Sequence, residues 1–142
     1  MSWFQKEIII SPKSRGFHLI TNEIIESAPE ISHYKKGLMH IYIKHTSASL
    51  TINENADSTV RDDMESHFNN FVPENAPYYK HIFEGSDDMP AHLKSTIIGS
   101  SVTIPITDGT LSLGVWQGIY LCEHRDSQHN RTIIITINGE ST

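Results

Sequence analysis

Short apolar stretches alternate with polar residues along much of the chain, and turn-forming residues close each of them. A period of two is typical of half-buried β-strands. We therefore predict strands at residues 4–11, 16–20, 37–44, 102–106, 111–113, 118–123 and 132–137. The first two are expected to pair as a hairpin, and so are the last two. Asp108-Gly109 separates the fourth strand from the fifth and is a strong hairpin turn signal.

Three stretches have the apolar spacing and the end signals of helices. The first begins with Thr21 as its N-cap and is stopped by Pro29. The second begins near Asp57, and the third has Asp88 as its N-cap and Gly99 just past its end. In the second helix an apolar stripe is expected to face the core, formed by Val60, Met64, Phe68 and Phe71.

Strands outnumber helices and hairpin signals dominate, which favours an α+β fold over a wound parallel sheet. We expect a single domain over residues 1–142 that contains a compact, antiparallel, sandwich-like sheet and two to three helices. Residues 75–86 are predicted to form a long loop. Such a loop in a compact domain indicates a functional or interface segment.

Composition narrows the class of protein. No apolar run approaches the roughly 20 residues that span a bilayer, and the N-terminus lacks the order of a signal peptide. The only cysteine is Cys122, so an internal disulfide framework is excluded and a cytoplasmic location is expected. A net charge of −6 argues against a nucleic-acid surface. The nine histidines invite a search for a metal or proton-transfer site.

A dense polar run follows the strand at residues 37–44. His45 is in phase with the inward side chains of that strand, and Thr46 and Ser47 supply hydroxyls beside free backbone N–H groups, which suit a phosphate. Asn53 and Asp57 complete the run. The alternative interpretation is a histidine hydrogen-bonded at a sheet edge, with Asn53 and Asp57 as turn and capping residues.

His92 lies near the start of the third helix, where the local dipole disfavours an imidazolium. The neutral form is the one that binds a metal. The alternative is an ordinary polar residue on an exposed helix face. His45 and His92 fit no metal motif such as HExxH. A shared zinc or magnesium site is therefore a hypothesis about their positions in space.

Trp116 and Gln117 stand between Gly114 and Gly118, which permit close approach of the backbone. An amide beside a large ring suits a heteroaromatic ligand or a partner loop. The alternative is a core tryptophan next to a hydrogen-bonded glutamine.

A last polar group occupies residues 123–131. Glu123 is a candidate to hold a cation or a proton, and Arg131 offers paired donors to a phosphate. The alternative is a salt-bridged loop, which is the preferred interpretation for Arg125 and Asp126.

The chain resembles the YjbQ-type protein family, often labelled secondary thiamine-phosphate synthase. The likeness covers nearly the whole chain and includes the segments HTSASLTINENAD and DDMPAHLK. Val115 departs from the family, which usually has Thr there. The family signature is carried by Ser101, Ile104, Ile106, Gly109, Gly114, Trp116, Gln117 and Ile119.

The resemblance implies an α+β fold, a homotrimer, and a reaction that joins a hydroxymethylpyrimidine diphosphate to a thiazole phosphate with release of pyrophosphate. It implies a site lined by His45, Asn53, Asp57, His92 and Glu123.

We therefore expect a cytoplasmic enzyme with weak or broad thiamine-phosphate synthase activity. In this hypothesis His45 and His92 hold a divalent cation or substrate, Asp57 and Glu123 act as ligand or base, and Arg131 contacts phosphate. Two alternatives stay open. One is a metal-dependent hydrolase of a small phosphorylated metabolite, and the other is a trimeric ligand-binding protein without catalysis.

Overall fold

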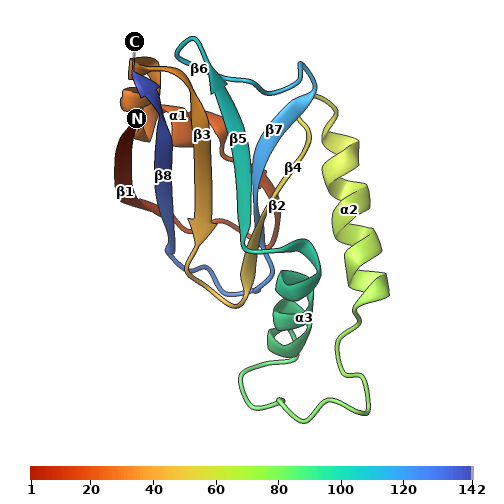
Figure 1. Cartoon of the computed structure of the whole chain (residues 1–142). Helices are drawn as coiled ribbons and strands as arrows, with labels where there is room; N and C mark the ends of the chain where they lie inside the picture. The colour runs from red at the N-terminus through yellow and green to blue at the C-terminus, as the bar shows by residue number, and fades with distance from the viewer. Residues whose placement is uncertain (142) are drawn as a thin grey trace.

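The computed structural model describes residues 1–141, which fold into two antiparallel sheets (Figure 1). The larger sheet has the strand order β1–β8–β3–β5–β6. These strands are Ser2–Ile10, Arg131–Ser141, Tyr34–Ile43, Ser101–Thr107 and Thr110–Leu111. The smaller sheet has the order β2–β7–β4. Its strands are Gly16–Leu19, Gln117–Glu123 and Ala48–Glu54.

Three α-helices and one 3₁₀ segment complete the described chain. They are α1 (Thr21–Ser27), the 3₁₀ segment Pro29–His33, α2 (Ser58–Phe71) and α3 (Asp88–Ile98). In Figure 1 α2 runs beside the smaller sheet, and α3 lies below it near the start of β4. The predicted α+β class with antiparallel sheets and two to three helices is confirmed. Among residues 1–141 no helix is both long and apolar enough to cross a membrane.

The core is built from alternating strand residues of both sheets. In β8 every second side chain is buried, including Ile133 and Ile135, because a pleated strand turns alternate residues to one face. Ile41 in the larger sheet and Leu50 and Leu121 in the smaller one belong to the same apolar cluster. The two sheets therefore share one core.

Two predicted strand pairings are wrong. β1 pairs with β8 and β2 pairs with β7, so the first two strands do not form a hairpin. β7 and β8 also lie in different sheets. In both cases the connecting segment, residues 11–15 or 124–130, passes from one sheet to the other. Local alternation shows that a residue stretch is a strand but does not show which sheet it joins.

The turn between β5 and β6 is confirmed: Asp108 and Gly109 both have positive φ, as a tight hairpin turn requires. The helix starts need correction. Asp87, not Asp88, occupies the N-cap position of α3. Thr21 is the first residue of α1, and its Oγ1 accepts a hydrogen bond from the Ile119 N–H instead of capping the helix.

The apolar stripe of α2 is only half confirmed. Met64 and Phe68 pack against a small cluster that contains Phe17 and Tyr120. Phe71 is 64% exposed, and no side chain of α2 is fully buried. The helix therefore covers the edge of the core without being part of it.

Candidate functional site

Three potential metal ligands converge at the start of α3. Asp88 and His92 lie four residues apart on the helix and so share one face. His81 comes from the long loop between α2 and α3. His81 Nε2 lies 2.7 Å and His92 Nε2 3.1 Å from the same oxygen, Asp88 Oδ2. One ligand atom from each residue lies within 4.8 Å of the other two, and we call this group the triad.

Asp88 is the buried centre of the triad, only 1% exposed. Its second oxygen, Oδ1, pairs with Nη1 of Arg125 at 2.7 Å. Burial alone would raise the pKa of Asp88, but the hydrogen bond from His81 and the charges of His92 and Arg125 hold that pKa below its ordinary value. Asp88 is therefore ionised and presents Oδ2 to both imidazoles.

The orientation of His92 is set by the main chain. Its Nδ1 donates to the carbonyl oxygen of Thr46 at 2.9 Å, and its Nε2 faces Asp88 Oδ2. Both ring nitrogens thus face oxygen acceptors. An imidazolium satisfies this arrangement, and so does a neutral imidazole whose Nε2 binds a cation in place of a proton. The His92 side chain is 31% exposed, which leaves a path for a cation to arrive.

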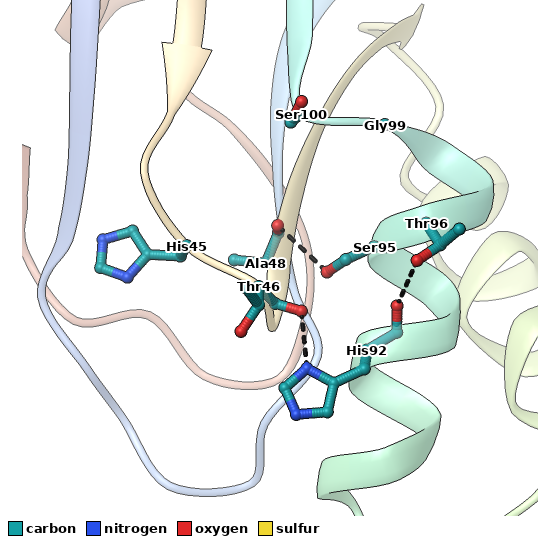
Figure 2. Close-up of a pocket in the computed structure, with 8 residues that line it drawn as sticks. All are labelled: His45, Thr46, Ala48, His92, Ser95, Thr96, Gly99 and Ser100. Carbon is teal, nitrogen blue, oxygen red and sulfur yellow. Dashed lines mark hydrogen bonds between the residues drawn. The ribbon is translucent and has the colours of Figure 1, made fainter.

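A pocket of about 490 Å³ opens beside His92, between α3 and the segment that joins β3 to β4 (Figure 2). Several hydroxyl groups line it. Ser95 Oγ donates to the carbonyl of Ala48, and Thr96 Oγ1 donates to that of His92. The pocket is lined by His45, Thr46, Ala48, His92, Ser95, Thr96, Gly99 and Ser100.

His45 lies at the same pocket but outside the triad. Figure 2 shows its ring turned away from His92. Its Nε2 accepts a hydrogen bond from the Thr132 N–H at 2.8 Å. Burial and the nearby Arg131 lower the pKa of His45. The two histidines therefore do not share a ligand position in this structure, because His45 uses its Nε2 to satisfy a backbone donor of β8.

Glu123 and Arg131 form a buried ion pair. Arg131 donates through Nε to Glu123 Oε1 at 2.8 Å and through Nη2 to Oε2. The same Nη2 donates to the carbonyl of Ser47 at 3.3 Å. Glu123 is 0% and Arg131 3% exposed. Glu123 Oε2 also accepts a hydrogen bond from the Arg125 N–H at 3.2 Å, so both residues are held by protein partners, as the salt-bridge alternative describes.

Asp57 caps α2. Its Oδ1 accepts hydrogen bonds from the N–H and the hydroxyl of Thr59, and these bonds lower its pKa. The capping interpretation of Asp57 fits the structure. The residue lies beyond the far end of β4, away from the triad.

The remaining predicted residues gather at that far end. Trp116 is 62% exposed, so it is not a core residue. Gln117 Oε1 accepts from the Gly114 N–H at 2.8 Å. Asn53, Trp116 and Gln117 line a shallow depression of about 310 Å³. The length of β4 separates this depression from the triad by roughly 20 Å, about six strand residues.

Sequence reasoning found one triad residue, His92, and missed two. From the sequence, Asp88 is expected to be a helix cap, and His81 belongs to the predicted functional or interface loop at residues 75–86. The spacing of Asp88 and His92 was the available signal, because positions i and i+4 of a helix meet on one face. No local sequence pattern indicates that His81 is a ligand, because only the course of the loop between α2 and α3 brings it to the site.

The chain is similar to known proteins over almost its whole length. A family model described as "UPF0047 protein YjbQ-like" matches residues 6–140. UPF0047 protein YjbQ of Salmonella typhimurium is 52% identical over 97% of this chain and 99% of that protein. UPF0047 protein YugU of Bacillus subtilis is 39% identical over 84% of this chain and 87% of that protein.

Solved structures have the same fold. An uncharacterized YjbQ/UPF0047 protein of Clostridium acetobutylicum has a TM-score of 0.83 at 35% identity, covering 94% of this chain and 99% of that chain. A YbjQ-like protein of unknown function from Sulfolobus solfataricus has a TM-score of 0.86 at 24% identity, covering 98% and 99%.

Proposed function

The chain belongs to the UPF0047 YjbQ-like family, and we propose that it is a metal-dependent enzyme that acts on a small phosphorylated metabolite. The observation that supports this most is the convergence of His81, Asp88 and His92 beside an open pocket. We place the enzyme in the cytoplasm, since a chain with one cysteine and no disulfide is typical of reducing compartments.

The donor set favours a transition metal over magnesium. Two imidazoles and one carboxylate oxygen make three protein ligands, a set typical of catalytic zinc sites that keep a position open for water or substrate. Magnesium prefers oxygen ligands throughout. A cation held there supplies a Lewis acid that stabilises negative charge on a substrate oxygen.

A cation at the triad would also supply the positive charge that a bound phosphate needs. The two arginines near the site are committed to carboxylates: Arg125 to Asp87 and Asp88, and Arg131 to Glu123. Neither presents a free guanidinium to the pocket. A phosphorylated substrate therefore depends on the triad cation for charge compensation.

The family resemblance makes thiamine-phosphate synthesis the first reaction to test. In that reaction the thiazole nitrogen forms a bond to the pyrimidine methylene carbon, and the bond from that carbon to the diphosphate oxygen breaks. Negative charge develops on the departing pyrophosphate, where a cation stabilises it. The triad would bind this group through a cation, and the pocket beside His92 would receive the rest of the substrate.

A second candidate is hydrolysis of a small phosphate ester. The open position expected of a three-ligand site favours it, because such sites lower the pKa of a bound water to near neutrality.

The first experiment measures metal content by mass spectrometry on untagged protein. We expect about one equivalent of zinc in the wild type and less than about a tenth in Asp88→Asn and His92→Ala. His67→Ala is the matched control, because His67 stacks on Phe71 within α2 and is not a member of the triad. It should keep its zinc. Equal metal in wild type and both triad variants would refute the proposal.

The second experiment separates the reactions. Zinc-loaded protein is assayed with the pyrimidine diphosphate and thiazole phosphate together, and separately with a generic phosphate monoester. Turnover only of the pair supports the synthase, and turnover of the monoester supports the hydrolase. Zinc without either activity would favour the ligand-binding alternative.

We further propose a homotrimer, supported by the family resemblance and by apolar residues on the outer face of the larger sheet, such as Leu38 and Tyr42, which are 54% and 44% exposed. Light scattering should give about three times the 16.1 kDa of one chain. A mass equal to one chain would contradict it.

A further inference from the structure

We infer that Arg125 is a positioning residue that shapes the triad for metal binding; this rests on the proposed function. Its guanidinium contacts three acceptors at once. Nη1 lies 2.7 Å from Asp88 Oδ1, Nε donates to Asp87 Oδ2 at 2.8 Å, and Nη2 donates to the carbonyl of Glu84 at 2.9 Å. The side chain is only 16% exposed, so these contacts are shielded from competing water.

The contact between Arg125 Nη1 and Asp88 Oδ1 gives the two oxygens of Asp88 different partners. Oδ1 is held by Arg125, and Oδ2 alone faces His81 and His92. The carboxylate is therefore fixed in rotation and offers a metal one oxygen. A planar guanidinium is suited to this, because its donors are fixed relative to one another.

The other two contacts fix the backbone around the triad. Glu84 lies on the loop that carries His81, and Asp87 is the N-cap residue of α3. The Asp126 N–H also donates to Asp87 Oδ2 at 2.8 Å. One side chain thus connects the loop of His81, the start of α3 and the buried carboxylate between them.

Arg125 has two opposite effects on the affinity for a bound cation. The direction in which metal affinity changes when Arg125 is replaced therefore tests the inference. Its positive charge repels a cation at Asp88, so on Coulomb grounds alone its removal tightens metal binding. Its role as a positioning group predicts the reverse. Loss of partners that orient a ligand typically costs 10–100-fold in metal affinity.

The experiment measures zinc affinity by competition with a chromogenic chelator for wild type, Arg125→Lys, Arg125→Gln and Arg15→Lys. Arg15 is the matched control. It is 17% exposed and holds three carboxylates, those of Glu65, Glu74 and Asp126, but it does not touch the triad. We expect both Arg125 variants to bind zinc about 10–100-fold more weakly. Arg15→Lys should stay within about threefold of wild type.

Cobalt(II) absorption supplies a readout that mere loss of stability does not move. At saturating cobalt, the visible bands of both Arg125 variants should differ from wild type in position and intensity, because Asp88 is free to rotate. Arg125→Lys keeps the positive charge. If Arg125→Gln does not fold, the zinc affinity and cobalt spectrum of Arg125→Lys alone test whether Arg125 positions the triad.

Two results would overturn the inference. If the wild type binds zinc and the Arg125 variants bind it equally well or more tightly, with unchanged cobalt spectra, Arg125 does not position the triad while the proposed function stands. If the wild type itself binds no metal at the triad, the proposed function and this inference fail together.

Discussion

At the end of the smaller sheet where β4 begins and β7 finishes, Ser49, Glu123 and His124 are buried. At the opposite end of the same two strands, Trp116 and Gln117 are exposed. The register makes the comparison direct, since Ala48 pairs with Glu123 and Glu54 with Gln117. One pair of strands therefore carries a polar interior at one end and an open surface at the other.

The difference lies in how polar groups are satisfied. A buried polar group must have a partner, and at the buried end each one does: Ser49 Oγ lies 2.8 Å from His124 Nε2, and Glu123 pairs with Arg131. Such a network keeps its members in one conformation. The triad adjoins this rigid end, which suits a site whose ligands must keep their positions.

The largest effect is expected from Glu123→Gln, which breaks the buried ion pair. Arg131 would keep a buried charge without a counter-charge, and removing one partner of such a pair costs about 3–5 kcal/mol. The free energy of unfolding, measured in urea, should fall by that amount.

The control for this variant is Glu7→Gln. Glu7 pairs with Lys44 at the surface, where their side chains are 56% and 49% exposed. Exposed pairs contribute at most about 1 kcal/mol. Similar losses of unfolding free energy in the two variants would show that the buried ion pair contributes no more to stability than the surface pair.

A pH effect of intermediate size is expected from His124. Burial, with the charges of Lys94, Arg131 and Arg15, lowers the pKa of His124 to about 3. In the unfolded chain His124 has its ordinary pKa near 6.5 and binds a proton below that pH. In the folded protein His124 stays neutral until the pH approaches 3. Stability is therefore full above pH 6.5 and falls as the pH drops toward 3.

Between pH 7 and pH 5 this one group should remove about 2 kcal/mol of stability. In His124→Gln that part of the pH dependence should disappear, whatever the variant's stability at pH 7. Urea unfolding at a series of pH values measures it. Parallel pH profiles for the two proteins would rule out a neutral, buried His124 in the native state.

A smaller effect is expected from Asp57→Ala at the exposed end. The variant loses the N-cap of α2, so its melting temperature should fall by a few degrees. Zinc content should stay at the wild-type level, because Asp57 lies away from the triad. Loss of zinc or of turnover at full folding would restore Asp57 to the site.

The smallest effect is expected from Trp116→Ala. An exposed side chain outside a packed core contributes within about 0.5 kcal/mol to stability. Zinc content should also be unchanged. If trimer mass is lost in this variant, the exposed end is a contact between subunits. A stability loss as large as that of Glu123→Gln would contradict the distinction between the two ends.

The sequence was informative where local physics decides the outcome. Alternation located seven of the eight strands in residues 1–141 and missed β4, whose residues overlap the polar run that follows residues 37–44. Asp108-Gly109 predicted its hairpin because few residue pairs accept two positive φ angles. Strand partners depend on contacts between distant residues, so the pairing of β1 with β8 could not be read from local patterns.

The candidate site was predictable to the same extent. His92 was recognised from its place at the start of a helix, and its face also carries Asp88. The contribution of His81 depends on the course of the loop between α2 and α3, which Arg125 holds at its α3 end through the carbonyl of Glu84 and the carboxylate of Asp87. Glu123 and Arg131 were expected to meet a ligand but meet each other, because their burial was not visible in the sequence.

The hydrogen bond from His92 to the carbonyl of Thr46 has a consequence for genetic variation. The acceptor is a main-chain carbonyl oxygen, which every amino acid supplies. A codon change at position 46 therefore alters the pocket wall but leaves the orientation of His92 intact. A library of all substitutions at position 46 would vary the side chain that lines the pocket while His92 keeps its orientation. Thr46 is therefore a suitable position for changing substrate selectivity.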